Sequence, residues 1–232
     1  MRPPRSRFLL GVFLALCLAV PSTAHAGAPA PLGGGSPLES SAPSRCTAGF
    51  AAVAGASGSL IATGACGKPG DTIRSGGRLV GVVSAAQFPP NGAIVIRVTN
   101  TTDWRLVGSI PPADSKVTIT GSAEAPIGAP VCKYGVTTGW RCGVIQAKNQ
   151  TINFPDGTMT GLTRTNVCAE PGDGGGPFVS GTQAQGVLIG GTGNCAGGGT
   201  SYFLPVNPVL SAYGLTILTG PRKDGPQPHQ PQ

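Results

Sequence analysis

The segment Cys168-Ala169-Glu170-Pro171-Gly172-Asp173-Gly174-Gly175-Gly176-Pro177 holds four glycines and two prolines in ten residues. The whole chain shares this bias, with 38 Gly and 23 Pro among 232 residues. Glycine and proline break helices, whereas Val, Ile and Thr suit strands. Because 40% of the residues are apolar and only 11% are charged, the composition favours a folded domain over a disordered chain. We therefore expect many turns and strands, and few helices.

Short runs of strand-forming residues lie on both sides of this segment, each bounded by Gly, Pro, Asn or Asp. Their close spacing predicts a sandwich or a barrel. The one plausible helix is Pro208–Tyr213, which Gly214 closes. The predicted strands are Leu79–Val83, Ala93–Val98, Lys116–Thr120, Gly143–Ala147, Thr151–Phe154, Gln185–Ile189 and Tyr202–Val206.

The chain has two histidines, His25 and His229. His25 lies in the N-terminal targeting segment, and His229 lies in a polar, Pro-rich tail, 219–232, that we expect to be disordered. A histidine-ligated metal site and a histidine general base are therefore excluded from the expected folded body, and we expect no metal. Gly191–Ala196 partly matches a dinucleotide-binding pattern but lacks its strand–helix context, so we also expect no cofactor.

The N-terminus has the three parts of a secretory signal. Arg2, Arg5 and Arg7 form a basic start, Phe8–Val20 is an apolar stretch of 13 residues, and Ala24–Ala26 fits a cleavage site. We predict a signal peptide over residues 1–26 and secretion to the extracellular space after cleavage near Ala26. The apolar stretch is too short to span a bilayer, so we expect no membrane span; an uncleaved anchor is the alternative.

The cysteine count agrees with export. Cys17 leaves with the signal peptide, and an even number of cysteines remains. In an exported chain such a set predicts three disulfides, whose pairing the count alone leaves open. The remaining cysteines are Cys46, Cys66, Cys132, Cys142, Cys168 and Cys195.

The basic residues are scattered along the chain rather than clustered. The formal net charge is +7, and three of the contributing arginines lie in the signal peptide. A nucleic-acid interface is expected to be a basic patch or stripe with aromatic residues nearby. We therefore expect no nucleic-acid partner. Separately, we expect the chain to be a monomer.

The segment 168–177 resembles the nucleophile loop of chymotrypsin-like serine peptidases, whose pattern reads Gly-Asp-Ser-Gly-Gly-Pro. The resemblance is to the bacterial branch that contains α-lytic endopeptidase and the streptogrisins. It covers roughly residues 32–218 and is strongest after residue 124. Further matching stretches are Val131–Lys133, Thr137–Gly139, Cys142–Gly143, Gln183–Val187, Gly190–Cys195, Pro205–Asn207 and Leu210–Leu215.

The resemblance implies an all-β fold of two packed antiparallel β-barrels, the trypsin-like fold, with a short C-terminal helix. The first barrel would cover residues 32–123 and the second residues 124–218. Independently of the resemblance, the Pro, Gly, Ala and Ser content of residues 27–45 predicts a flexible or extended leader. The resemblance also implies three disulfides that close loops local in the sequence. These are Cys46–Cys66, Cys132–Cys142 and Cys168–Cys195.

The chemistry of this family uses a Ser that attacks the carbonyl, a His that takes its proton, and a buried Asp that orients the His. The resemblance places Gly174 at the nucleophile position. It aligns Ala62–Cys66 with Thr-Ala-Gly-His-Cys, which leaves Ala65 at the position of the base. It aligns Phe88–Gly92 with Phe-Pro-x-Asn-Asp, which leaves Gly92 at the position of the orienting acid.

Two further residues bear on these positions. Ile189 stands where the family usually has a Ser that supports the triad Asp. Asp103 or Asp114 could be a displaced acid, which would restore neither the Ser nor the His. We therefore predict that the chain is not an enzyme but an inactive serine-peptidase homologue.

The predicted function is that of a secreted pseudoprotease with a vestigial substrate cleft. The resemblance implies that Leu188-Ile189-Gly190-Gly191 is an exposed strand that pairs with the substrate backbone, and we expect it to pair with an extended peptide or with the reactive loop of a proteinaceous protease inhibitor. The backbone N–H groups of Gly172 and Gly174 would be the oxyanion-hole donors. This recognition uses main-chain groups and therefore does not depend on the triad.

Two alternatives stay open. One is a serine endopeptidase by descent, with displaced catalytic groups, for which Ser57, Ser59 and Ser201 offer hydroxyls. The other is a structural or surface protein with no ligand.

Overall fold

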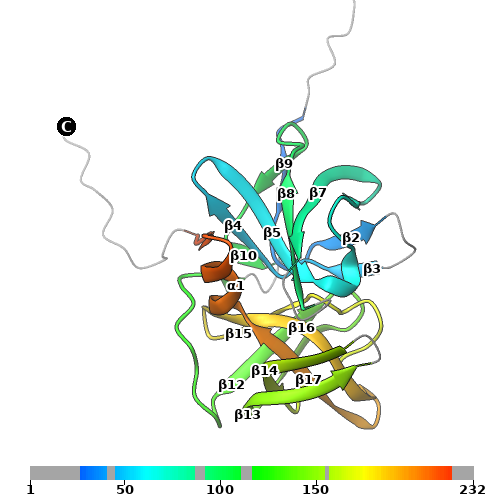
Figure 1. Ribbon diagram of the computed structural model, residues 1–232, viewed down its shortest axis with the longest axis vertical. Coiled ribbons are helices and arrows are strands. Elements are labelled where there is room, and N and C mark those ends of the chain that lie inside the picture. The colour runs from blue at the N-terminus through cyan, green and yellow to red at the C-terminus, as the bar shows by residue number, and fades with distance from the viewer. Residues whose placement is uncertain (1–26, 41–44, 87–91, 111–116, 155–156, 221–232) are drawn as a thin grey trace, which may run out of the picture.

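A computed structural model of the chain describes residues 27–40, 45–86, 92–110, 117–154 and 157–220. The predicted signal peptide, both histidines, Asp114, residues 88–91 and most of the predicted tail lie outside these residues. Strands dominate the described part and form two units stacked one above the other (Figure 1). No helix among the described residues is long and apolar enough to cross a membrane.

The upper unit in Figure 1 is an eight-stranded antiparallel sheet in the order β18-β4-β5-β8-β7-β6-β2-β3. Beside it, β1 pairs with β9 and β10 pairs with β11. A single 3₁₀ turn, η1 (Gly64–Cys66), follows β5. The strands are β1 (Ala30–Leu32), β2 (Pro37–Ser40), β3 (Arg45–Thr47), β4 (Phe50–Ala54), β5 (Ser57–Thr63), β6 (Thr72–Ser75), β7 (Arg78–Ala86), β8 (Ala93–Val98), β9 (Trp104–Leu106), β10 (Ser109–Ile110), β11 (Val117–Thr118) and β18 (Thr216–Ile217).

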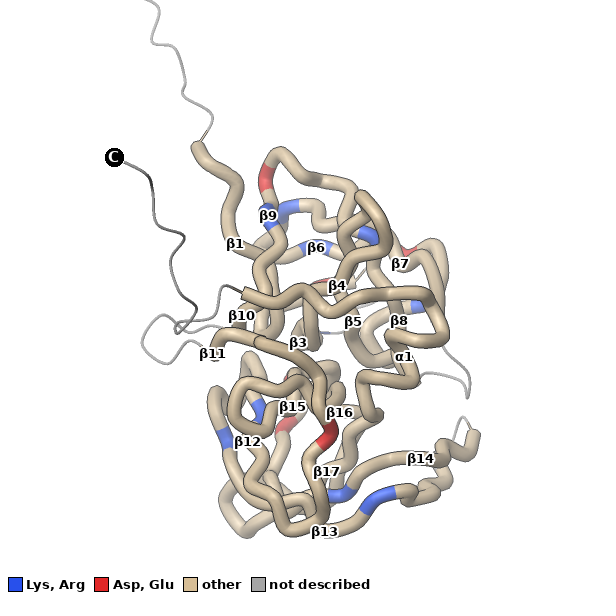
Figure 2. The backbone as a smooth tube through the Cα atoms, turned by 90° about the vertical axis from the view of Figure 1, so that its left-hand side faces the viewer, with Lys and Arg blue, Asp and Glu red and all other residues tan. Residues whose placement is uncertain are grey.

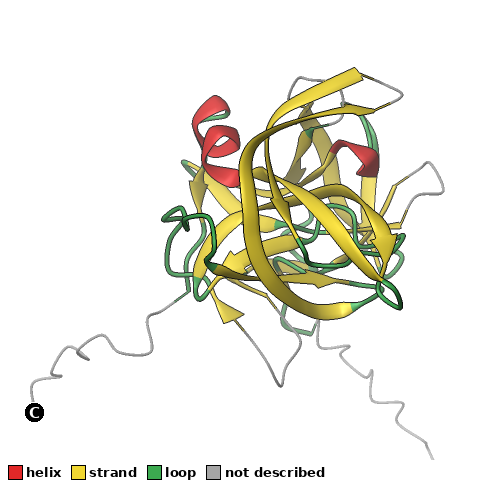
Figure 3. Ribbon diagram, turned by 90° about the horizontal axis from the view of Figure 1, so that it is seen from below, coloured by secondary structure: helices red, strands yellow, loops and turns green. Residues whose placement is uncertain are grey.

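The lower unit is a closed barrel in the order β12-β13-β14-β17-β16-β15. All of its strand pairs are antiparallel. Seen from below, the strands wrap around this barrel (Figure 3). Its strands are β12 (Pro130–Gly135), β13 (Gly139–Phe154), β14 (Gly157–Thr165), β15 (Pro177–Ser180), β16 (Gln183–Asn194) and β17 (Gly198–Pro205).

The predicted fold class is confirmed, with one difference in detail. The N-terminal unit is an open, half-barrel sheet that ends at β3 and β18, rather than a closed barrel. The short strand β18 pairs with β4, so the chain returns to the N-terminal unit at its C-terminal end. The residue boundaries between the two predicted barrels stay predictions, and the predicted leader contains β1 and β2.

Two of the predicted strands form one strand in the structure. Gly143–Ala147 and Thr151–Phe154 both belong to β13, which runs without a break over residues 139–154. The register with β14 shifts between Ala147 and Gln150, and Asn149 at that bulge has a φ of 54°. Asn tolerates this left-handed conformation better than most residues. The polar interruption in the sequence is therefore a bulge rather than a turn.

The predicted C-terminal helix is confirmed as α1 (Val206–Ala212). It begins before Pro208 because the first N–H groups of a helix have no intrahelical partner, so proline is tolerated in the first turn. Val206, Val209 and Leu210 are buried at the spacing of one helix face. They pack in the cluster between the two units, where α1 is seen in Figure 1.

Three apolar clusters hold the fold together. One fills the sheet of the N-terminal unit and includes Leu60 and Ile96, and one fills the barrel around Phe178 and Phe203. The third lies between the units and joins Phe50 and Ile61 to Val187. Because this third cluster takes residues from both units, it fixes the position of β16 against β5, next to the candidate site.

Three disulfides join Cys46 to Cys66, Cys132 to Cys142, and Cys168 to Cys195, the pairing that the resemblance implies. Each closes a loop of 10 to 27 residues in the sequence.

Figure 2 shows the Lys and Arg positions spread over both units, interrupted by few acidic residues.

Candidate functional site

The glycine-rich loop, residues 168–176, lies directly before β15 and is held by one buried carboxylate. Asp173 is fully buried and accepts hydrogen bonds from the Nζ atom of Lys133 (2.7 Å) and from the hydroxyl of Thr138 (2.6 Å). Three backbone N–H groups, those of Thr137, Thr138 and Glu170, each donate to it at 3.1 Å. Five donors satisfy this buried carboxylate without solvent, and they tie the loop to Lys133 of β12 and to the turn at Thr137 and Thr138.

The Lys133–Asp173 ion pair shifts the pKa values of both groups. Burial raises the pKa of Asp173, but the hydrogen bonds from Lys133 and Thr138 outweigh it, and the net pKa is lowered. Burial lowers the pKa of Lys133 and outweighs the opposing attraction of Asp173. Both side chains are fully buried, so each charge depends on the other.

Thr47 links the loop to the N-terminal unit. Its N–H donates to the carbonyl of Gly174 (2.9 Å), and its hydroxyl donates to the carbonyl of Gly172 (2.9 Å). The same hydroxyl accepts from the N–H of Val136 (3.0 Å). Among the described residues, no hydrogen bond is donated by the N–H groups of Gly172 and Gly174 themselves. In the loop, the carbonyls of Gly172 and Gly174 therefore accept hydrogen bonds from Thr47, whereas their N–H groups have no acceptor among the described residues.

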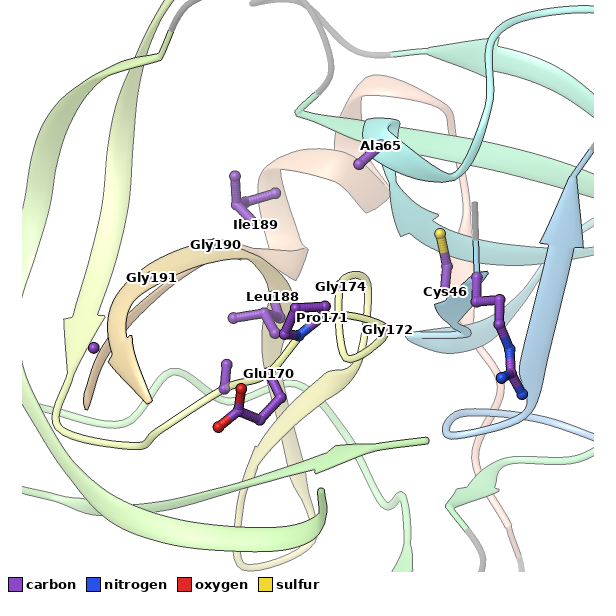
Figure 4. A pocket seen from close by; sticks show the side chains of 13 residues that line it. Cys46, Ala65, Glu170, Pro171, Gly172, Gly174, Leu188, Ile189, Gly190 and Gly191 are labelled. Carbon is purple, nitrogen blue, oxygen red and sulfur yellow. The ribbon is translucent and has the colours of Figure 1, made fainter. Parts of the chain in front are cut away.

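A cleft of about 390 Å³ lies between the loop, β16 and η1. Figure 4 shows Gly190 and Gly191 at one end, Gly172 and Gly174 in the middle, and Cys46 at the other end. The cleft is lined by Arg45, Cys46, Ala65, Ala169, Glu170, Pro171, Gly172, Gly174, Leu188, Ile189, Gly190, Gly191 and Gly193.

The structure brings most of the predicted site residues together here. Ala65 is exposed on η1 and lines the cleft opposite Gly174, as Figure 4 shows. Ile189 is half-buried on β16 and also lines the cleft. Gly92 is buried in a bend directly before β8 and does not line it. A Cβ atom at position 174 would have Thr63 Cγ2 as its one neighbour, at 3.5 Å, so this position has room for a side chain.

The β16 edge that faces the cleft is open beyond Val187. β15 pairs with β16 only as far as Val187, whereas β17 covers the other edge through Asn194. Leu188 exchanges hydrogen bonds with the loop, since its N–H donates to Gly176 and its carbonyl accepts from Gly175. After Leu188, the cleft-facing edge of β16 therefore has no strand partner among the described residues.

The family model described as Trypsin matches residues 108–212. The structure of Thermobifida fusca Protease A is 43% identical, with a TM-score of 0.76 over 82% of this chain and all of that chain. The chain belongs to the trypsin-like serine protease family. Nocardiopsis Protease (NAPase) is similar to this serine protease homologue to the same degree, at 44% identity and a TM-score of 0.76 over 82% of this chain and 100% of that one.

Streptogrisin-C of Streptomyces griseus is 45% identical over 179 residues, which is 75% of this chain. This serine protease homologue spans only part of the streptogrisins that it matches. It covers 38% of streptogrisin-C, 57% of streptogrisin-A and 45% of streptogrisin-D.

These relatives contradict the prediction that the chain is not an enzyme. The two structures that match at 43–44% identity are both described as proteases, and this likeness favours an active serine protease. The prediction weighed the residue types at the triad positions, the histidine count and Ile189. The fold that supports the site is retained: the loop, its buried ion pair, the cleft and the three disulfides are all in place. We correct the prediction accordingly.

Of the displaced catalytic groups considered for this serine protease homologue, those that the structure describes do not line the cleft. Ser59 and Ser201 are buried, and the hydroxyl of Ser201 is hydrogen-bonded to Thr165 (2.8 Å). Ser57 is exposed at the start of β5 but does not line the cleft, and neither does Asp103, whose carboxylate accepts from a neighbouring Asn side chain. Among the described residues no group of His, Cys, Asp or Glu is arranged to hold a metal ion.

Sequence reasoning missed three residues that shape this site. Lys133 lies on the inward face of β12, between the buried Val131 and Gly135. A lysine at an inward position of an apolar strand needs a buried acid, and that pattern could have pointed to Asp173. Thr47 gave no such signal, because its contacts with Gly172 and Gly174 join residues about 125 positions apart. Glu170 binds the N–H of Cys195 (2.8 Å), which no local pattern predicts.

Proposed function

We propose that the cleft takes an extended segment of polypeptide as its substrate and that the chain hydrolyses it, which is the reaction class of its protease relatives. The observation that carries this proposal is the pair of uncommitted N–H groups at Gly172 and Gly174, beside the open edge of β16. Together they offer a carbonyl-binding point and a strand-pairing edge in one cleft. We also propose export after cleavage near Ala26, and a monomeric state.

The polypeptide would pair antiparallel with Leu188–Gly191, adding one strand to the barrel. Main-chain hydrogen bonds supply the affinity in this mode of recognition, and side-chain pockets supply the selectivity. Gly190 and Gly191 present no side chains that would keep the polypeptide away. The reactive loop of a protease inhibitor is extended in the same way and would bind the same edge.

The carbonyl of the bound polypeptide would lie over the N–H groups of Gly172 and Gly174. Such donors stabilise the negative charge that develops on the oxygen when the carbonyl is attacked. We place the triad-equivalent positions at Ala65, Gly92 and Gly174, where no side chain can act as nucleophile or base. The attacking group is then water, whose oxygen bonds to the carbonyl carbon while its hydrogen passes to the leaving nitrogen as the C–N bond breaks.

The rate expected for this chemistry is low. Binding and an oxyanion hole alone leave a rate enhancement of roughly 10³–10⁴ over water when triad members are absent from a serine protease. An activated ester is therefore a better first probe than an amide, because its uncatalysed hydrolysis is fast enough to measure.

The test is release of p-nitrophenol from a peptide p-nitrophenyl ester by the purified exported chain. We expect a saturable rate above the blank that a serine-directed phosphonate does not abolish, because no serine is the nucleophile. An activity that the phosphonate removes would indicate a displaced serine or a contaminating protease. A rate equal to the blank, with the fold intact, would overturn the proposed hydrolysis, and calorimetry with an uncleaved peptide would then test binding by itself.

A further inference from the structure

Arg45 begins β3 at the end of the cleft away from Gly191. It is exposed and lines the cleft, and it also lines a neighbouring hollow of about 510 Å³, which we call the side hollow. Pro171 and Gly172 line both spaces as well. Val136 and Thr137 complete the side hollow. The cleft and the side hollow therefore adjoin at the glycine-rich loop, and among the described residues Arg45 is the one charged residue that lines the side hollow.

No described residue neutralises Arg45. The two ion pairs of the described part of the chain are Lys133–Asp173 and Lys148–Glu124. Glu39 lies opposite Arg45 in the register of β2 and β3, but the two form no ion pair. Glu170 also lines the cleft, but its carboxylate accepts from the N–H of Cys195. Arg45 is thus a cation at the cleft that forms no ion pair with any acidic residue the structure describes.

The direction of the bound polypeptide decides which of its residues meets Arg45. β16 runs from Leu188, beside the loop, to Gly191, farther from it (Figure 4), so an antiparallel polypeptide runs from Gly191 toward Leu188 and Gly174. Beyond Gly174 it continues toward Cys46, at the opposite end of the cleft in Figure 4, and so toward Arg45. We call the carbonyl of the polypeptide that lies over the N–H groups of Gly172 and Gly174 the held carbonyl. The residues that follow it in the polypeptide are therefore those that reach the side hollow.

We infer that this end of the cleft selects polypeptides with an acidic side chain one or two positions after the held carbonyl. A guanidinium binds a carboxylate through two parallel N–H donors, which a glutamine amide does not match. Because Arg45 is exposed, the preference is modest. Ion pairs of this kind change an equilibrium by about two- to fivefold and weaken with salt. The inference rests on the proposed function and names the substrate class for it.

The test uses one fluorescent peptide made in three forms, with Glu, Gln or Lys at both positions after the held carbonyl. Dissociation constants are measured by fluorescence anisotropy for the unaltered chain, Arg45→Gln and Arg45→Lys. Arg97→Gln is the matched control, since Arg97 is exposed on β8 and lines neither space. We expect the Glu peptide to bind about two- to fivefold more tightly than the Gln peptide at low salt, and the Lys peptide to bind most weakly.

The preference is expected to vanish in Arg45→Gln, to persist in part in Arg45→Lys, and to be unchanged in Arg97→Gln. Equal binding of all three peptides to the unaltered chain would overturn the inference and leave the proposed function standing. Loss of the preference in Arg97→Gln as well would also overturn it, because the effect would then be one of net charge. If none of the peptides bound, the proposed function would fail, and the acid preference with it.

Discussion

The Nζ atom of Lys133 lies 2.7 Å from Oδ2 of Asp173, and neither side chain is exposed to solvent. This ion pair joins β12 to the glycine-rich loop, which carries Gly172 and Gly174. A buried charge without its partner is costly, so the conformation of the loop depends on both residues being present. The donors at the cleft are therefore supported from inside the barrel rather than from the cleft itself.

Removing Lys133 should destabilise the fold strongly. Lys133→Met leaves Asp173 charged and buried, and we expect the free energy of unfolding to fall by about 3–5 kcal/mol. Urea unfolding measured by fluorescence checks this value. Lys148→Met is the control, because Lys148 forms an ion pair with Glu124 at the surface, and its loss should cost no more than about 1 kcal/mol. Equal effects of the two substitutions would contradict the assigned role of the buried pair.

The carboxylate of Asp173 should make the free energy of unfolding depend on pH. The pKa of Asp173 is lowered in the folded state from its ordinary value of 3.8, so in acid the unfolded chain binds the proton more tightly. The stabilisation from Asp173 is therefore complete above that ordinary pKa and is lost as the pH falls through the folded pKa. Unfolding free energies of the unaltered chain and Asp173→Asn, measured from neutral pH to about pH 2, should converge toward the acid end. A constant difference between them would refute this linkage.

The disulfides should differ in their contribution according to loop length. Cys168–Cys195 closes 27 residues and Cys132–Cys142 closes 10. In the chain-entropy model, replacing the first pair with Ser should cost about 1 kcal/mol more than replacing the second. Denaturant unfolding of the two double variants gives the comparison. A larger loss for Cys132–Cys142 would mean that contacts in the folded barrel, not chain entropy, dominate.

Substitution by alanine should lower the free energy of unfolding much more at Gly175 than at the adjacent Gly174. Gly175 has a φ of +84°, and a Cβ atom there would press on the carbonyl of Thr47, so Gly175→Ala should cost roughly 1–3 kcal/mol. Gly174 has an ordinary φ, and its Cβ would have only Thr63 in van der Waals contact, so Gly174→Ala should change stability by less than about 1 kcal/mol. Thermal unfolding of the two variants tests this contrast. A large loss for Gly174→Ala would show that position 174 has no room for a side chain.

The sequence predicted the strand-rich class, the C-terminal helix and the location of the glycine-rich loop because these depend on local patterns. It did not predict that β13 runs through Asn149, since a bulge and a turn use the same residue types. It also did not predict that Thr47 orders the loop, because that contact spans the two units. The prediction that the chain is not an enzyme was wrong. It rested on the residue types at a few aligned positions and on the histidine count, whereas the likeness to proteases extends over 82% of the chain.

The proposed triad-equivalent positions can be tested by restoring the side chains that the family chemistry requires. Ala65→His, Gly92→Asp and Gly174→Ser are combined in one variant, and Ile189→Ser is added in a second to give the Asp a supporting hydroxyl. Position 174 has room for a side chain, and Ala65 is exposed at the cleft. We expect the restored chain to hydrolyse the ester on the order of 10³-fold faster or more, because losing the Ser or His of a complete triad costs about 10⁶ in turnover.

Phosphonate labelling at position 174, located by mass spectrometry, separates a working triad from a general change in the cleft. Gly174→Ser alone is the control, and it should gain neither rate nor label because no base activates the hydroxyl. The informative comparison is between restored variants that keep the melting temperature of the unaltered chain. If both fold and neither gains rate or label, Ala65, Gly92 and Gly174 are not the positions of the triad, and the catalytic geometry has to be sought from other residues of the cleft.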